Sequence, residues 1–260
     1  MIALRMAFVV AVILVMTTVV IVPHLILMAW GGPIASIIPQ FWHKVARRLL
    51  LIDIIIEGEP LTGEPVLFVS NHVSWLDIVV MGAALRASFV AKREVGTWPV
   101  ISLLSNLQRS VYVSRDRKTA AKEQKIMQAR LERGESLILF PEGTSNDGLR
   151  VGEFRSAFLS LADLEVKGEK VKVQPFAITY TKVDGFPVTR RSMPQVAWYG
   201  DMDLAPHLKG VFAGGPYEVR LRFFAPVTID EIGNRKALAR HCRDLIVRGN
   251  SEALSAGSVA

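Results

Sequence analysis

An apolar run near the N-terminus restricts what this chain can form more than any other feature of its sequence. Residues 6–22 read MAFVVAVILVMTTVVIV, and after Pro23 and His24 the run resumes as LILMAW at residues 25–30. Together they have the length that a helix needs to cross a bilayer core of about 30 Å. The run is long for a signal peptide, and no small-x-small cleavage site follows it. We therefore expect a membrane-anchoring helical segment at the N-terminus.

Aromatic and basic residues after this run mark a membrane interface. Phe41 and Trp42 suit the headgroup level, and each cation of the basic cluster at residues 44–48 gains about 1 kcal/mol beside an anionic leaflet. The cluster predicts that the following chain lies on the cytoplasmic side of the inner membrane. Pro23 and Pro33 leave two alternatives open, a straight span and a re-entrant helical hairpin.

The remainder of the chain has the mixed composition of a single domain. We expect an anchor and interfacial segment over residues 1–45, one domain over 46–248 and a flexible tail over 249–260. Strands alternate with helices, which predicts an α/β fold in which a layered mixed sheet is flanked by helices. The expected elements are strands at 66–70, 88–91, 110–114, 137–140, 172–180 and 217–224, a helix from Ser74, and helices over 119–133 and 234–248, the last closed by Gly249.

Charge and cysteine content narrow the partners of the chain. The formal net charge of +7 indicates an anionic partner, which could be nucleic acid, a membrane surface or a phosphorylated substrate. No helix-turn-helix pattern, aromatic-rich platform or zinc-ligand spacing accompanies the charge, so nucleic acid is disfavoured and no metal site is expected. Cys242 is the only cysteine, which excludes an intrachain disulfide.

A histidine and an aspartate flank the expected start of the helix at Ser74. Ser74 and Asp77 fit a capping box, with Ser74 as the N-cap and the carboxylate in the first turn. His72 can fold back over that turn, so its imidazole could meet the Asp77 carboxylate and act as a general base toward a hydroxyl. By spacing alone, the simpler interpretation is that Asp77 caps the helix and His72 is a loop residue.

A second candidate loop, FPEGTS at residues 140–145, follows the expected strand at 137–140. It offers a glycine for close backbone approach, a carboxylate and two hydroxyl groups, and could hold a polyol phosphate. The alternative is an ordinary turn, because proline and glycine are common in loops.

Together, NHVSWLD at residues 71–77 and FPEGTS at 140–145 resemble the glycerolipid acyltransferase family, which includes lysophosphatidic acid acyltransferases. The resemblance spans about residues 66–180. It implies that His72, paired with Asp77, deprotonates the hydroxyl of a lysolipid acceptor. That hydroxyl then attacks the thioester of acyl-CoA or acyl-carrier-protein, without a cofactor, a metal or a covalent acyl-enzyme.

The resemblance also implies substrate-binding residues. Glu142, Gly143 and Thr144 belong to the motif that binds the acyl acceptor, Arg115 is assigned to the acceptor phosphate, and Pro175 lies in a weaker fourth motif, VQPFAI. Basic residues between the two main motifs could form a surface that faces phosphate and membrane, or they could simply be solvated, as most charged residues are. They are Lys92, Arg93, Arg109, Arg115, Arg117 and Lys118, of which Lys92 and Arg109 are counted as substrate-binding.

The acceptor headgroup is where the sequence departs from the family. Residues 109–115 read RSVYVSR, where the family often has glycine first and aspartate before the final arginine. Residues 196–203, VAWYGDMD, resemble the proteobacterial branch that includes lyso-ornithine lipid acyltransferases. The first expectation is an acyltransferase that makes phosphatidic acid from lysophosphatidic acid, the second is a lyso-ornithine lipid acyltransferase, and the third is an inactive membrane scaffold.

Two further predictions follow from the residues. A hydrolase is disfavoured because the chain has no Gly-x-Ser-x-Gly elbow. The apolar run at residues 98–107 could dock on lipid or line an acyl tunnel, but packing in the core is favoured for a stripe of this kind.

Overall fold

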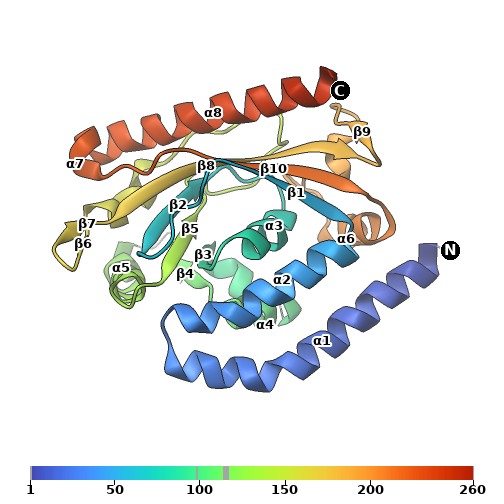
Figure 1. The fold of residues 1–260 in the computed structure, drawn as a ribbon, viewed down its shortest axis with the longest axis horizontal. Coiled ribbons are helices and arrows are strands. Elements are labelled where there is room, and N and C mark those ends of the chain that lie inside the picture. Colours follow the sequence, from blue (N-terminus) through green and yellow to red (C-terminus); the bar gives the residue numbers. More distant parts are fainter. Residues whose placement is uncertain (1, 98, 114–116, 260) are drawn as a thin grey trace.

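The computed structural model describes residues 2–97, 99–113 and 117–259 of the chain. In Figure 1 a twisted sheet lies between the long helix α8 (Arg235–Val259) on one face and a group of helices on the other. That group contains α2 (Ile37–Leu49), α3 (Leu76–Ala84) and α4 (Pro99–Leu107), and α1 (Ile2–Trp30) runs along its outer side. The predicted α/β fold with a layered sheet and flanking helices is confirmed.

The sheet has the strand order β1-β10-β8-β2-β5-β3-β4, with β9 paired to β8. The pairs among β2, β5, β3 and β4 are parallel, whereas β10 and β8 are antiparallel, so the sheet is mixed. Its strands are β1 (Ile52–Glu57), β2 (Val66–Ser70), β3 (Ala87–Lys92), β4 (Val111–Val113), β5 (Ser136–Leu139), β8 (Lys172–Val183), β9 (Phe186–Pro187) and β10 (Tyr217–Phe223). A separate small hairpin joins β6 (Glu165–Val166) to β7 (Glu169–Lys170).

The remaining elements connect these strands. They are α5 (Arg117–Glu132), α6 (Leu204–Ala213), α7 (Ile229–Ile232) and the 3-10 helices η1 (Pro33–Ser36), η2 (Arg93–Thr97), η3 (Ser156–Asp163) and η4 (Met193–Gln195). Strand β2 is buried along its whole length, as its uninterrupted run VLFVS predicts for a parallel strand covered on both faces. Because β2, β5 and β3 are parallel neighbours, the loops that follow them gather at one edge of the sheet.

The N-terminal segment forms a helical hairpin. Helix α1 continues through Pro23, and the chain reverses at Gly31 and Gly32, whose φ angles are +72° and +67°. The returning α2 is tied to α1 by a 2.9 Å hydrogen bond from Trp42 Nε1 to Thr17 Oγ1. By length and composition α1 could cross a membrane, and little of its most apolar stretch is buried against the protein.

The end of the last helix differs from the expectation. Helix α8 does not close at Gly249 but continues to Val259, where a flexible tail was predicted. Gly249 is a close-contact position, since an added Cβ would lie 2.9 Å from Phe224 Cζ and 3.2 Å from Ala177 Cβ. Its glycine therefore lets the helix pack on the sheet, and Ala253, one turn further on, is buried. Strand β1 was also missed, at an edge of the sheet beyond the anchor.

Candidate active site

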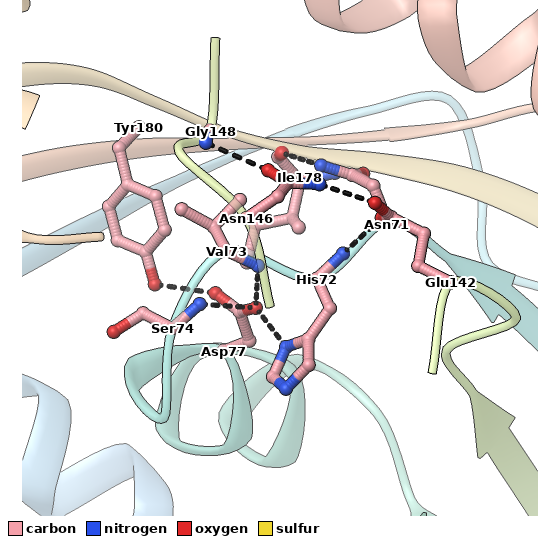
Figure 2. Close-up of polar contacts among 10 residues, drawn as sticks. All are labelled: Asn71, His72, Val73, Ser74, Asp77, Glu142, Asn146, Gly148, Ile178 and Tyr180. Carbon is pink, nitrogen blue, oxygen red and sulfur yellow. Dashed lines mark hydrogen bonds and ion pairs between the residues drawn. The ribbon is translucent and has the colours of Figure 1, made fainter. Parts of the chain in front are cut away.

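His72 and Asp77 lie together at the carboxyl end of β2, where the chain turns into α3 (Figure 2). His72 Nδ1 is 2.7 Å from Asp77 Oδ2, and the Asp77 side chain is fully buried while 22% of the His72 side chain is exposed. The His72 ring stacks on Phe140, with 4.2 Å between ring centroids and 17° between planes. These contacts fix the ring and direct Nε2 away from the carboxylate.

The Asp77 carboxylate accepts four hydrogen bonds. Oδ2 accepts from His72 Nδ1 and from the backbone N–H groups of Val73 and Ser74, at 2.7 and 3.0 Å, and Oδ1 accepts from the Tyr180 hydroxyl at 2.8 Å. Burial, followed by the nearby Asp77 charge, raises the pKa of Tyr180 well above its usual range, so the phenol remains a donor. A carboxylate held in this way keeps the proton of neutral His72 on Nδ1 and leaves Nε2 as the acceptor.

The predicted capping box forms only in half. The Asp77 carboxylate reaches back to the Ser74 N–H, as expected, but α3 begins after Trp75 and has no side-chain cap. Among the described residues, the buried Ser74 hydroxyl has no hydrogen-bond partner. The carboxylate therefore stabilises the turn and the imidazole together, a combination that the capping pattern alone does not predict.

Glu142 connects the second motif to the first. Its Oε1 accepts from the His72 backbone N–H at 2.9 Å, and its Oε2 accepts from Gly152 N–H at 2.7 Å and from the Asn146 side-chain amide. Asn146 N–H in turn donates to the His72 carbonyl at 3.0 Å. Burial raises the pKa of Glu142, while its three hydrogen-bond donors oppose that shift. Both oxygens are engaged inside the protein, so Glu142 holds the backbone of His72 in place.

Several supporting residues escaped the sequence analysis. The Asn71 side chain exchanges hydrogen bonds with Ile178 of β8, at 2.9 Å to the carbonyl and 3.0 Å from the N–H. Asn71 adjoins the predicted histidine, and Asn146 directly follows the FPEGTS loop. Their positions beside the two motifs could have identified them as supporting residues. Tyr180 offered none, because it is 103 residues from Asp77 in the sequence.

A cavity of about 590 Å³ opens beside His72. Of the predicted substrate-binding residues, Lys92, Gly143 and Thr144 line it. Most of its wall is apolar, and helices α1, α2, α3, α4 and α6 all contribute lining residues. Ile101 and Leu104 of α4 are among the lining residues, so the preference for core packing in the run at 98–107 is wrong at these two positions.

The chain is similar in sequence to known acyltransferases. A family model described as Acyltransferase matches residues 53–179. The lyso-ornithine lipid O-acyltransferase of Brucella abortus strain 2308 is 43% identical over 208 residues, which cover 78% of each chain. This chain belongs to the acyltransferase family. The 1-acyl-sn-glycerol-3-phosphate acyltransferase of Neisseria meningitidis strain MC58 is 31% identical over 195 residues, covering 73% of this chain and 72% of the relative.

A crystal structure supports the fold of this acyltransferase. The 1-acyl-sn-glycerophosphate acyltransferase of Thermotoga maritima aligns with a TM-score of 0.69 over 96% of this chain and 94% of that one, at 21% identity. The alignment extends over nearly the whole chain, so the N-terminal helices and the sheet domain together follow that fold.

Two of the predicted binding residues, Arg109 and Glu142, are not among the residues that line the cavity. Arg109 is buried, with Nη2 at 2.7 Å from Glu135 Oε1 and Nη1 donating to the Gly32 carbonyl at 3.2 Å. It has a φ of +60° in the turn before β4, and its guanidinium ties that turn to Gly32, where the N-terminal helical hairpin reverses. The expectation that Arg109 binds substrate is therefore corrected to a structural ion pair. Arg115 lies outside the described residues.

Other chemistries find little support in the described residues. No group of three or more His, Cys, Asp or Glu side chains among them could hold a metal ion. Cys242 is buried, and that burial raises the pKa of its thiol to about 12, which keeps it from acting as a nucleophile. The arrangement around His72 is suited to general-base activation of a hydroxyl group.

Proposed function

We propose that this acyltransferase transfers a fatty-acyl chain from a thioester to the free hydroxyl of a lyso-ornithine lipid. The observation that carries the proposal is the 43% identity to the Brucella enzyme of that name, against 31% to the Neisseria lysophosphatidate enzyme over a similar share of the chain. This replaces lysophosphatidic acid, the first expectation from sequence, with the second.

The position of one sequence stretch supports the same acceptor. Residues 196–203 resemble the branch that includes lyso-ornithine lipid acyltransferases, and Trp198, Tyr199 and Gly200 line the cavity beside His72. Trp198 N–H also donates to the Val73 carbonyl at 3.0 Å, so this stretch is fastened to the His72 loop. A stretch in this place could contact the acceptor directly.

In the proposed reaction, the acceptor hydroxyl lies against His72 Nε2. As its oxygen attacks the thioester carbonyl carbon, Nε2 takes the hydroxyl proton and Asp77 stabilises the resulting imidazolium. The tetrahedral intermediate then expels the thiolate, which receives that proton from His72. An ester and a free thiol are the products. Asp77 and His72 act without a covalent acyl-enzyme, and the reaction needs no cofactor or metal.

The proposed setting is the cytoplasmic face of the inner membrane. The single apolar N-terminal helix and relatives that act on membrane lipids support membrane association. The basic cluster at residues 44–48 supports the cytoplasmic orientation, where acyl-CoA or acyl-carrier-protein is available as donor. The bilayer and these two kinds of substrate are then the partners of the protein, and nucleic acid is not.

The test offers two acceptors separately. Membranes that contain the protein are incubated with a labelled acyl thioester and either lyso-ornithine lipid or lysophosphatidic acid. We expect labelled product with lyso-ornithine lipid, at a rate well above that with lysophosphatidic acid. Product from lysophosphatidic acid alone would show that the proposed acceptor is wrong, and product from neither acceptor with folded protein would favour the inactive scaffold.

The His72→Ala variant tests the proposed base. We expect its turnover to fall by roughly 10² to 10⁴, the usual contribution of a positioned general base. Its membrane association and its thermal unfolding should remain close to those of the wild-type protein, because His72 is partly exposed and is not a core residue. Turnover within tenfold of wild type would refute the assignment.

A further inference from the structure

Arg155 lies directly against the glycine of the FPEGTS loop. Its backbone N–H donates to the Pro141 carbonyl at 3.0 Å, which ties the start of η3 to this loop. Its guanidinium carbon is 3.9 Å from the position that a Cβ on Gly143 would take, and Phe158 Cε2 is 3.3 Å from the same position. Gly143 has a φ of +70° and no side chain, so the guanidinium rests over bare backbone.

The Arg155 side chain is exposed, and within the described part of the chain no carboxylate or other hydrogen-bond acceptor pairs with it. Arg243, which reaches the nearby segment 151–153, is different. Its Nη2 is 2.9 Å from Glu153 and its Nε donates to the Gly152 carbonyl. A guanidinium presents a fork of donors that matches carboxylate and phosphate groups. The guanidinium donors of Arg155 therefore remain available to a ligand beside the FPEGTS loop.

The loop beneath Arg155 forms part of the wall of the His72 cavity. Gly143, Thr144 and Phe158 line that cavity together with His72. An anionic group held by Arg155 would therefore lie at the edge of the space in which the acceptor and donor react. The Thr144 hydroxyl could provide a second donor to the same group.

We propose that Arg155 binds an oxyanion of a substrate at the mouth of this cavity. The proposal rests on the acyltransferase function proposed above. Two substrates carry such a group, the acceptor with its headgroup carboxylate and the donor with the phosphate of its pantetheine arm, a diphosphate in acyl-CoA and a phosphodiester in acyl-carrier-protein. Binding by Arg155 lowers the KM of whichever substrate carries the group, without taking part in proton transfer.

The experiment compares Arg155→Ala and Arg155→Lys with Arg150→Ala in the full-length protein in membranes. Arg150 is an exposed arginine near Arg155 in the sequence and serves as the matched control. KM and kcat are measured for the acceptor at saturating donor and for the donor at saturating acceptor. We expect Arg155→Ala to raise one of the two KM values roughly tenfold, with Arg155→Lys between it and wild type. The kcat should stay within about twofold, and Arg150→Ala should match wild type.

The acceptor methyl ester, which lacks the carboxylate, distinguishes the two sources. If the acceptor carries the bound group, wild type uses the ester roughly tenfold less well than the acid and Arg155→Ala uses both alike. If the donor carries it, the ester and the acid are used alike by every variant, and the donor KM is the one that rises.

Both KM values within twofold of wild type in Arg155→Ala would overturn the proposal. So would a fall in kcat alone, since that would indicate disturbance of His72. A failure of the proposed acceptor is recognised separately, because wild-type protein would then acylate lysophosphatidic acid and not lyso-ornithine lipid. In that case the KM values of the Arg155 variants would be measured with lysophosphatidic acid as the acceptor, and its phosphate would be the group that Arg155 binds.

Discussion

Two buried carboxylates at the same sheet edge both accept a hydrogen bond from His72, but at different places. Asp77 meets the imidazole, at 2.7 Å from Nδ1, and Glu142 meets the backbone N–H, at 2.9 Å. In the proposed reaction the imidazole gains a charge during proton transfer, whereas the backbone N–H does not change. Asp77 therefore affects the chemistry of the ring, and Glu142 affects where the ring lies. The two residues look equally functional in the sequence, and only their partners separate them.

The largest difference should come from Asp77→Asn. The amide can present N–H to Nδ1 and so favour the imidazole tautomer in which Nε2 carries the proton and cannot act as a base. We expect kcat to fall by roughly 10³. The amide oxygen can still accept from the Tyr180 hydroxyl, but the Val73 and Ser74 N–H groups lose their acceptor, so the variant should fold with a lower melting temperature. Steady-state rates and circular dichroism of the purified protein check this. A kcat within tenfold of wild type would contradict the proposal that Asp77, unlike Glu142, affects the proton-accepting role of the imidazole.

Glu142→Gln should have a smaller effect of a different kind. One of the donors now facing Glu142 would meet the new amide N–H, and an unsatisfied buried donor costs about 1–3 kcal/mol. We expect kcat to fall by roughly tenfold and the apparent melting temperature to drop. The shape of the pH–rate profile should match wild type, because the His72–Asp77 contact is kept. A shifted profile would mean that Glu142 takes part in proton transfer.

Tyr180→Phe removes one of the four donors to Asp77 without changing the shape of the side chain. Hydrogen bonds to charged groups contribute about 1.5–3 kcal/mol, and Tyr180 is fully buried, so the free energy of unfolding should fall by about 1.5 kcal/mol. We expect kcat to fall only about threefold, since three donors still orient the carboxylate. Denaturant titration and initial rates measure the two effects. A larger loss of kcat than in Asp77→Asn would contradict the proposed order.

The smallest effect is a pH dependence from Glu142. Burial raises its pKa in the folded protein above the usual 4.5, so the folded state binds this proton more tightly than the unfolded state. Its contribution to stability is therefore full below pH 4.5 and is lost as the pH rises through the raised pKa. In Glu142→Gln this decline should be absent. Measuring the melting temperatures of the wild-type protein and Glu142→Gln from pH 4 to pH 8 tests this prediction. The same pH dependence in both proteins would contradict a raised pKa of Glu142.

Much of the site could be predicted because its central pair is local. His72 and Asp77 are joined by one turn at the start of α3, and short-range geometry is readable from sequence. Arg109 was wrongly predicted to bind substrate because its partner, Glu135, lies in a distant segment between α5 and β5. Tyr180 reaches Asp77 only because β8 lies beside β2 in the sheet. Such contacts depend on strand order, which alternating strands and helices do not specify.

The same limit applies to the fold. The strands of the central sheet were predicted where apolar runs of strand length occur, and β2, β3 and β10 lie where expected. Gly249 was taken as a helix end because glycine often follows the last turn of a helix. Its actual role depends on Ala177 of β8 and on Phe224, which directly follows β10. A glycine that allows close packing and one that ends a helix look alike until the neighbours are known.

The participation of α1 in the cavity wall bears on how such an enzyme can be engineered. Ile13, Val20 and Ile21 of α1 line the same space as His72. A water-soluble version made by deleting this helix would leave the binding site open along one side. An unrelated anchor joined at residue 37 would restore attachment but not that wall. Grafting α1 from a relative would therefore test whether this wall sets the selectivity for acyl chains, with the rest of the enzyme left as it is.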